Sequence, residues 1–417
     1  MSYYVVRGGQ ALRGTVPISG AKNSVLPILA ATLLNGGRNV LHNCPDLRDV
    51  RSAMAILEHL GCKVTREGDT VTVDSSTVNR WDVPHSLMRE MRSSVIFLGP
   101  ILARCGKACL SLPGGCEIGQ RPIDLHLSAL RHLGVTIREQ GGDILCEASD
   151  LHGRDVILSF PSVGATENTM LAATACPGVT RVINAAREPE IADLQEFLRK
   201  AGALVSGGGE SVITVSGTTP RRDVEHTILP DRIEAATFLC ATAACGGEVT
   251  LTGVEPEHVG TVIQCLRDGG CTVRSAGRTI TLLAPQRLGS MPTVRTMPYP
   301  GFPTDSQAPL MAAACTAQGS ALFIETIFEN RFRHAAELQR MGADIRISGR
   351  TALVTGKQLH GAQVRSTDLR GGAALVVAAL AAQGESRVED LTHIDRGYEH
   401  FAEKLTGLGA KIQRRDD

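Results

Sequence analysis

The stretch AILEHLGCKVTRE, residues 55–67, has the pattern that decides the fold of this chain. Its apolar residues first recur at helical spacing, a glycine marks where the helix must stop, and the next residues alternate as in a strand. Five later stretches repeat this pattern: residues 128–140, 196–208, 264–276, 337–349 and 403–415. Their glycines, spaced 67–73 residues apart, are Gly61, Gly134, Gly202, Gly270, Gly342 and Gly409. The chain is therefore predicted to be a sixfold repeat.

Each repeat also contains an Ala-rich helix that is apolar on almost every side, followed by glycine and a second strand. The six copies are residues 22–41, 92–112, 166–183, 231–251, 305–324 and 368–388. A helix that is apolar all round is normally buried, and Ala and Gly let neighbouring helices approach closely. We therefore expect an α/β fold with the Ala-rich helices inside and the amphipathic helices and sheets around them.

The number of repeats also predicts the domain organisation. Three units of this kind can close around a shared axis, so six units favour two similar lobes of about 200 residues each. The junction is expected between the third and fourth copies, near residues 227–230. A continuous solenoid of six repeats is the competing architecture. It is less favoured because no repeat has the polar character of an end cap.

Charge and composition exclude several classes of partner. The 417 residues contain 43 Lys plus Arg and 43 Asp plus Glu, and only 3% are aromatic. A nucleic-acid binder normally carries a basic excess or a row of stacking aromatics, and neither is present. The longest apolar run, residues 373–382, is far shorter than the ~20 residues that span a bilayer. No secretory signal begins the sequence, so we expect a cytoplasmic protein that binds neither nucleic acid nor membrane.

The twelve cysteines do not form a metal or disulfide pattern. They are scattered, with no CxxC pair and no histidine at zinc-finger spacing, so most are expected to be small buried hydrophobes. Cys105 and Cys109, four residues apart, would share one face of a helix, where core packing is favoured over a two-ligand metal site. No metal and no cofactor are expected.

The first residues of the Ala-rich helices point to chemistry. We expect these helices to begin at Lys22, Arg92, Thr166, Asp231, Asp305 and Asp368. Helix N-termini attract anions, and aspartate there is an ordinary N-cap, which is the better interpretation of Asp231. Lys22 and Arg92 oppose the helix dipole, and a charge misplaced in this way is more often functional.

The segment LPGGCEIGQRPIDLH, residues 112–126, presents a cysteine on a glycine-rich turn. Cys116 is followed closely by Arg121, Asp124 and His126. A cysteine on an open loop near cations has the environment of a reactive thiol, whereas the other cysteines lie mostly in apolar runs. The alternative is a structural turn with a buried cysteine.

Nine segments taken together closely resemble the UDP-N-acetylglucosamine 1-carboxyvinyltransferase family of bacterial enolpyruvyl transferases. They are GAKNSVLPILAATLL (20–34), MRSSVIFLGPILAR (91–104), GGCEIGQRPIDLH (114–126), PSVGATEN (161–168), LPDRIEA (229–235), YPGFPTDSQ (299–307), IFENRFRHAAELQRMGA (327–343), TDLRGGAALV (367–376) and IDRGYEH (394–400). The resemblance covers nearly the whole chain and every repeat. It implies a two-lobed inverse α/β barrel, with residues 22–229 in one lobe and residues 1–21 plus 230–417 in the other.

The resemblance also implies a reaction: transfer of the enolpyruvyl group of phosphoenolpyruvate to the 3′-hydroxyl of UDP-N-acetylglucosamine, with release of phosphate. This is the first committed step of peptidoglycan biosynthesis. The family pattern makes Cys116 the proton donor, able to form a phospholactoyl adduct, and Asp305 the base, with Asp368 a second carboxylate that stabilises the cationic intermediate. Cations for the donor trianion would be Lys22, Arg121, Arg370 and Arg396, with Asn23 as a neutral donor.

The same family pattern implies the sugar-nucleotide site and an inhibitor. The matching positions are Arg92, Arg121, Pro122, Ile123, Asp124, Leu125, Ser162, Val163, Gly164, Asp305 and Ile327. Arg331 also belongs to the pattern, as a substrate contact or as a residue that positions the lobe. The epoxide antibiotic fosfomycin is expected to alkylate Cys116.

Two alternatives remain at this stage. A 3-phosphoshikimate 1-carboxyvinyltransferase would share the donor and the repeat, but the Cys116 loop and PSVGATEN argue against it. A catalytically silent repeat protein would have no need of the set formed by Lys22, Cys116, Asp305 and Arg396. Departures from the family pattern are small: Glu117 and Gln120 flank the thiol, and Gly371 and Gly372 replace bulkier or polar residues.

Overall fold

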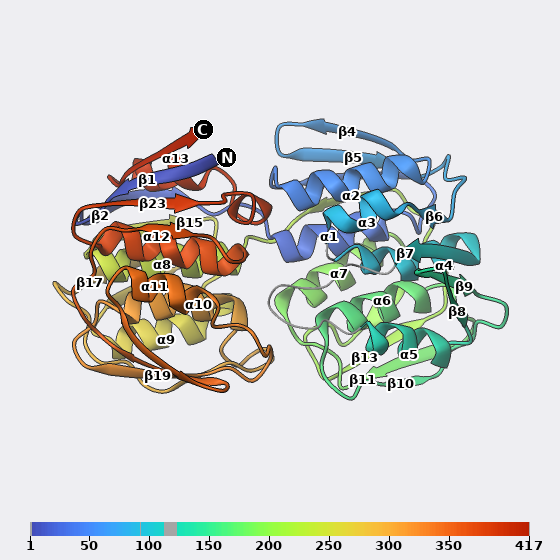
Figure 1. Ribbon diagram of the computed structural model, residues 1–417. Helices are drawn as coiled ribbons and strands as arrows, with labels where there is room; N and C mark the ends of the chain where they lie inside the picture. Colours follow the sequence, from blue (N-terminus) through green and yellow to red (C-terminus); the bar gives the residue numbers. More distant parts are fainter. Residues whose placement is uncertain (1, 92, 112–122, 417) are drawn as a thin grey trace. The chain divides into compact units, whose positions relative to one another are not determined.

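The computed structural model describes residues 2–91, 93–111 and 123–416. Within these ranges the chain forms two compact units (Figure 1). Residues 20–91, 93–111 and 123–229 make up the N-terminal unit, and residues 2–19 with 230–416 make up the C-terminal unit. Each unit contains three repeats of an inner helix, an outer helix and a four-stranded sheet, so the predicted sixfold α/β repeat is confirmed.

The N-terminal unit contains six helices of the repeat. The inner helices are α1 (Lys22–Ala31), α4 (Leu98–Cys105) and α6 (Val163–Ala173), and the outer helices are α2 (Arg48–His59), α5 (Asp124–His132) and α7 (Pro189–Lys200). A short helix and a 3-10 turn lie between the first two repeats: α3 (His85–Glu90) and η1 (Ser94–Phe97).

Three sheets of the N-terminal unit have the orders β14-β3-β5-β4, β6-β7-β9-β8 and β10-β11-β13-β12. Their strands are β3 (Arg38–His42), β4 (Lys63–Glu67), β5 (Thr70–Asp74), β6 (Asp82–Val83), β7 (Lys107–Ser111), β8 (Thr136–Gln140), β9 (Asp143–Glu147), β10 (Asp155–Ile157), β11 (Val179–Ile183), β12 (Leu204–Ser206), β13 (Val212–Ser216) and β14 (Val224–Thr227). In each sheet the first two strands of the order are parallel and the remaining pairs are antiparallel.

The C-terminal unit repeats this plan. The inner helices are α8 (Arg232–Cys245), α10 (Thr304–Ala314) and α12 (Leu369–Ala381), and the outer helices are α9 (Gly260–Asp268), α11 (His334–Arg340) and α13 (Phe401–Gly407). Two 3-10 turns accompany them: η2 (Pro256–Val259) and η3 (Ile394–Arg396).

Two strands from the start of the chain complete sheets of the C-terminal unit. The sheet orders are β16-β17-β15-β2, β18-β19-β21-β20 and β22-β23-β1-β24. The strands are β1 (Ser2–Arg7), β2 (Leu12–Pro17), β15 (Gly247–Thr252), β16 (Thr272–Ala276), β17 (Thr279–Ala284), β18 (Val294–Arg295), β19 (Ser320–Ile324), β20 (Asp344–Ser348), β21 (Thr351–Thr355), β22 (Gln363–Arg365), β23 (Glu385–Glu389) and β24 (Lys411–Asp416). In Figure 1 the blue strand β1 accordingly lies beside the red β23.

The six repeat glycines end the outer helices for a physical reason. All of them have φ between 90° and 100°. That left-handed conformation closes the last helical turn and is strained for a residue with a Cβ atom. The glycine spacing read from the sequence therefore marks six real helix ends.

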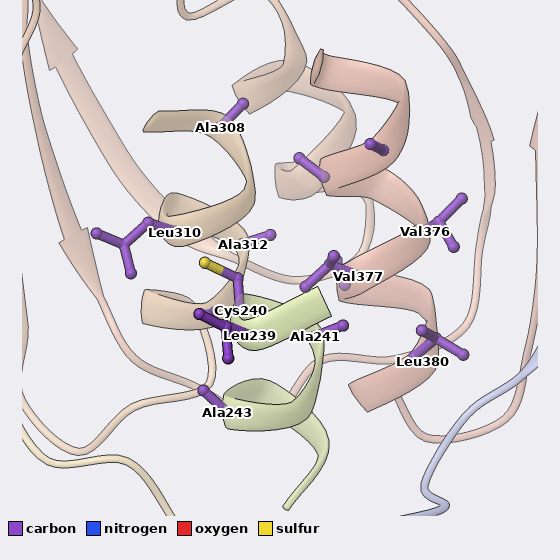
Figure 2. Packing of buried hydrophobic residues seen from close by; sticks show 14 of the residues in the cluster. Leu239, Cys240, Ala241, Ala243, Ala308, Leu310, Ala312, Val376, Val377 and Leu380 are labelled. Carbon is purple, nitrogen blue, oxygen red and sulfur yellow. The ribbon is translucent and has the colours of Figure 1, made fainter. Parts of the chain in front are cut away.

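The inner helices of the C-terminal unit form its core. Figure 2 shows Ala308, Leu310 and Ala312 of α10, Val376, Val377 and Leu380 of α12, and the α8 residues Leu239, Cys240, Ala241 and Ala243. All of these side chains are buried in one apolar cluster. Because small residues alternate with branched ones, the helix axes can approach closely while the gaps stay filled.

Three expectations about local structure are corrected. Helix α6 begins at Val163 rather than Thr166, because the Ser162 side chain caps it by accepting the N–H of Ala165 at 3.4 Å. Helix α4 begins at Leu98 rather than at Arg92, because residues 94–97 form the 3-10 turn η1. Cys105 ends α4 while Cys109 lies in β7, so these two cysteines do not share a helix face.

Candidate active site

In the C-terminal unit, Asp305 is held by two buried guanidinium groups. It is the second residue of α10, where the helix dipole favours a carboxylate. Its Oδ1 accepts from Nη2 of Arg331 at 2.7 Å, and its Oδ2 accepts from Nη2 of Arg370 at 3.3 Å. The arginines are 3% and 2% exposed, whereas 27% of the Asp305 side chain is exposed. The carboxylate is thus fixed in place and still reachable.

Asp368 is the N-cap of α12, and the cap interpretation of its role is confirmed. Its Oδ1 accepts from the backbone N–H groups of Arg370 and Gly371, both at 3.0 Å. Burial alone would raise the pKa of Asp368, but the charge of Arg331 and the Gly371 N–H outweigh it and hold that pKa below its ordinary value. Asp368 is therefore an anion that also orients the backbone of Arg370.

Arg331 is anchored independently of the two aspartates. Its Nε and Nη2 donate to the carbonyl oxygen of Thr304 at 3.3 and 3.2 Å. Its Nη1 lies 3.9 Å from Oδ1 of Asp368. Arg331 therefore connects the start of α10 with the start of α12, and the structure places it in the carboxylate cluster.

Glu325, which the sequence analysis missed, orders the loop that contains Ile327. Its Oε1 accepts the backbone N–H groups of Ile327 and Phe328, and its Oε2 accepts the hydroxyl of Thr304 at 3.0 Å. Since the N–H of Ile327 is used in this way, its carbonyl is the backbone group left for a ligand. A buried glutamate just after an apolar strand was the signal available in the sequence.

Further groups surround Arg370. Its guanidinium carbon lies 5.3 Å from the centre of the Tyr398 ring, and the Tyr398 hydroxyl hydrogen-bonds to Thr237 at 2.8 Å. Asp231 caps α8 through the N–H groups of Ile233 and Glu234, as expected. Arg396, at the end of η3, is half-buried.

His334 is a second residue that sequence reasoning missed. It begins α11, it is fully buried, and its ring lies near the Asp368 carboxylate and the backbone of Arg331. Burial lowers the pKa of His334 to about 4, against the opposing effect of Asp368. A neutral imidazole therefore packs behind the carboxylate cluster.

In the N-terminal unit, Lys22 forms a shielded ion pair. It is the first residue of α1, and its Nζ lies 2.8 Å from Oδ2 of Asp49 in the first turn of α2. The Asp49 side chain is fully buried and that of Lys22 is 12% exposed. The carboxylate offsets the unfavourable position of a cation at a helix start. The neighbouring Asn23 is half-buried.

A hydrogen-bonded network holds the first turn of α1. The Ser24 hydroxyl donates to Oδ2 of Asp193, and Oδ1 of Asp193 lies 2.9 Å from Nε2 of His226. Asp193 also accepts the backbone N–H of Leu229 at 3.3 Å. Here the carboxylate lies between the serine and the histidine, so the imidazole is not in contact with the serine hydroxyl and the network is a positioning device.

The start of α6 has two backbone N–H groups that are not used by the helix. Ser162 uses its side chain and its carbonyl for Ala165 and Thr166, and the N–H groups of Val163 and Gly164 have no hydrogen-bond acceptor among the described residues. Ser162, Val163 and Gly164 are all half-buried.

His126 packs against this turn as a neutral ring. Its Nδ1 accepts from the side-chain amide of Asn168 at 2.8 Å, and burial lowers the pKa of His126 to about 4. The same amide group of Asn168 bonds Gly99 and Val95, which joins α6 to α4 and η1. Asp124 is exposed at the start of α5, between the half-buried Ile123 and Leu125.

Four predicted site residues lie outside the described residues: Arg92, Cys116, Arg121 and Pro122. Among the described ones, the structure brings Asp305, Asp368 and Arg370 together in one unit. It places Lys22, Asn23 and the α6 turn in the other unit.

The described ranges were searched for metal-ligand clusters, disulfides and membrane-spanning helices. No cluster of three or more His, Cys, Asp or Glu side chains there is arranged to hold a metal ion. The eleven described cysteines form no disulfides, and burial raises the pKa of each. Among the residues searched, no helix is long and apolar enough to span a bilayer.

Comparison with known proteins decides the family. The profile of the family described as EPSP synthase (3-phosphoshikimate 1-carboxyvinyltransferase) matches residues 6–405. UDP-N-acetylglucosamine 1-carboxyvinyltransferase 1 of Symbiobacterium thermophilum is 53% identical over 99% of this chain and 95% of its own. UDP-N-acetylglucosamine 1-carboxyvinyltransferase 2 of Caldanaerobacter subterraneus is 48% identical over 99% of this chain and its full length.

The chain belongs to the UDP-N-acetylglucosamine 1-carboxyvinyltransferase family of enolpyruvyl transferases.

Solved structures agree with this family assignment. The enolpyruvyl transferase NikO from Streptomyces tendae matches with a TM-score of 0.90 at 26% identity, covering 99% of this chain and 98% of its own. EPSP synthase from Acinetobacter baumannii matches with a TM-score of 0.73 at 18% identity over the full length of both chains, which shows a shared fold. The predicted enolpyruvyl transferase fold and transferase class are therefore confirmed.

Proposed function

We propose that this protein transfers the enolpyruvyl group of phosphoenolpyruvate to the 3′-hydroxyl of UDP-N-acetylglucosamine. Relatives at 46–53% identity over nearly the whole chain have the name of this activity. The observation that carries the proposal in the structure is Asp305, a fixed and accessible carboxylate between two buried arginines. Such a cluster suits a reaction that needs a base beside an anionic donor.

The mechanism proposed is an addition followed by an elimination. Cys116 gives a proton to the methylene carbon of the donor, and the positive charge that develops on the adjacent carbon is attacked by the 3′-oxygen of the acceptor. The proton of that hydroxyl passes to Asp305. Loss of a proton from the new methyl group and departure of phosphate then give the enol ether and inorganic phosphate.

The remaining residues bind the two anionic substrates. Lys22, Arg121, Arg370 and Arg396 would neutralise the donor, with Asn23 as an additional hydrogen-bond donor. The start of α6 at Ser162, Val163 and Gly164 would bind the diphosphate, and Arg92, the segment 121–125 and Ile327 would complete the sugar-nucleotide site. Asp368 would stabilise the cationic intermediate through its retained negative charge.

The experiment is phosphate release by the purified protein with substrates omitted in turn. Release should require both phosphoenolpyruvate and UDP-N-acetylglucosamine. Shikimate 3-phosphate in place of the sugar nucleotide should give none, and release with it would favour the 3-phosphoshikimate 1-carboxyvinyltransferase alternative. Absence of release under every condition would contradict the proposal.

We also propose that the protein acts in the cytoplasm and that it commits the sugar nucleotide to peptidoglycan, which serves cell shape and division.

A covalent probe tests the thiol, because we propose that fosfomycin alkylates Cys116. Mass spectrometry of a digest should place one adduct on Cys116 and none in Cys116→Asp. An adduct on another cysteine would contradict the assignment of the acid.

A further inference from the structure

Arg370 is a buried cation whose hydrogen-bonding capacity is largely unused. The residue is 2% exposed, yet its Nε and Nη1 have no hydrogen-bond partner in the described chain. Its Nη2 donates a long hydrogen bond of 3.3 Å to Asp305, and its guanidinium also interacts with the Tyr398 side chain. An unpaired buried donor costs roughly 1–3 kcal/mol, so a guanidinium in this state is a site for an additional acceptor.

The two arginines on Asp305 differ in how firmly they are held. Arg331 has a 2.7 Å bond to Asp305 and two further bonds to the carbonyl of Thr304. Arg370 donates the 3.3 Å bond to Asp305 and otherwise interacts with the neutral Tyr398 side chain, whose ring centre lies 5.3 Å from its guanidinium carbon. Arg331 is therefore a fixed support, and Arg370 is the partner that a competing anion can take from Asp305.

We propose that Asp305 and an anionic group of the donor compete for Arg370, so that donor binding releases Asp305 from the Arg370 guanidinium. This inference rests on the proposed function, and the competing group is the carboxylate or phosphate of the donor. A carboxylate that loses a cationic partner becomes a stronger base. The base of the reaction is thereby strengthened only when the donor is present.

The charged groups around the pair fit this exchange. Asp231 and Tyr398 act on Arg370 along with Asp305, and Asp368 fixes its backbone N–H. Arg331 remains on Asp305 in either state and keeps the carboxylate in place. His334, on α11, is neutral above a pH of about 4 and adds no charge at working pH.

The test is donor binding measured by calorimetry in a Cys116→Ala background, with each variant saturated with UDP-N-acetylglucosamine. Asp305→Asn frees Arg370 from its competitor, so phosphoenolpyruvate should bind on the order of tenfold more tightly. This gain in affinity should vanish when Asp305→Asn is compared with unchanged Asp305 in two proteins that both also carry Arg370→Gln. A general field effect of the Asp305 charge would instead survive Arg370→Gln, and that outcome overturns the proposal.

Two further outcomes are decisive. Weaker donor binding by Asp305→Asn would mean that Asp305 merely holds Arg370 in place, and it also overturns the proposal. If Arg370→Gln does not fold, Arg370→Lys replaces it: lysine keeps the charge without a second N–H edge, so the gain should shrink. Failure of every variant to bind phosphoenolpyruvate would refute the proposed function itself, which separates the two failures.

Discussion

The inner helices of the two units begin with residues of opposite charge, although the repeat is the same. In the C-terminal unit they have Asp231, Asp305 and Asp368, and buried arginines arrive from other segments. In the N-terminal unit α1 starts with Lys22, and α6 starts with a serine cap and two N–H groups. The first arrangement suits acid–base chemistry and the second suits anion binding.

Two buried carboxyl groups make the contrast measurable. The pKa of Asp368 is held below its ordinary value because a cation and backbone N–H groups outweigh burial. The pKa of Glu167, on α6, is raised well above its ordinary value by burial, with Glu190 and Glu188 adding to the effect. The repeat therefore does not dictate ionisation; the neighbours that each unit supplies do.

The largest expected effect is on catalysis by the C-terminal unit. Asp305→Asn should lower kcat by roughly 10²–10⁴-fold, because the base is lost while the side-chain shape is kept. Asp344→Asn, on β20, removes a carboxylate of the same unit whose ion-pair partner is Arg346 on the same strand, and it should leave kcat unchanged. Steady-state phosphate release gives both numbers. Equal activity of the two variants would break the assignment of base chemistry to Asp305.

The next effect tests the cation of the N-terminal unit. Asp49→Asn should lower the free energy of unfolding by about 3–5 kcal/mol, because it leaves the Lys22 ammonium buried without its carboxylate. Lys22→Met with Asp49→Asn should recover much of that stability and remain inactive. Urea unfolding and phosphate release separate the two roles. An active double variant would show that Lys22 serves only as the partner of Asp49.

The two carboxyl groups should respond to pH with opposite signs. The folded state favours the protonated form of Glu167, so this group lowers the stability of the protein as pH rises above 4.5, its ordinary pKa. Glu167→Gln should therefore be more stable than the wild type at neutral pH but not at pH 4. Asp368 contributes stability above 3.8 that is lost on acidification, so Asp368→Asn should be less stable at neutral pH. Urea unfolding from about pH 2 to about pH 8 covers the titration ranges of both groups. Shifts of the same sign would contradict the comparison.

The smallest effect concerns a glycine at the start of α12. A Cβ atom on Gly371 would lie 2.6 Å from Oδ2 of Asp368 and 2.9 Å from Oγ1 of Thr367. Gly371→Ala should therefore cost roughly 1–3 kcal/mol of unfolding free energy and reduce kcat. Gly407→Ala, in α13, should instead be neutral or stabilising, because a Cβ atom there would meet no described atom within 4 Å beyond its own helix and chain neighbours. Similar losses for both variants would show that Asp368 is not held as described.

The fold could be predicted well from the sequence because the outer helix of every repeat ends at a glycine. Gly61 and its five counterparts need a left-handed backbone, which is a local requirement that a sequence states directly. The start of α6 was predicted three residues late, because the capping contribution of Ser162 was not weighed against the polar residues that follow.

The site was predictable in part, and the reason is sequence distance. Asp305, Asp368 and Arg370 could be named from motifs, and the structure brings them together. The pair of Lys22 with Asp49 and the neutral His334 depend on contacts between separate elements. Periodicity and motifs contain no information on which partner a buried charge meets.

The central claim is that this chain joins an enolpyruvyl group to the 3′-oxygen of UDP-N-acetylglucosamine. The most direct test is a ¹H–¹³C correlation spectrum of the product made from ¹³C-labelled phosphoenolpyruvate. The account predicts a correlation between the sugar H3 and the enol ether carbon, with one phosphate released per product formed. An unmodified sugar nucleotide, or a correlation at another hydroxyl, would contradict it.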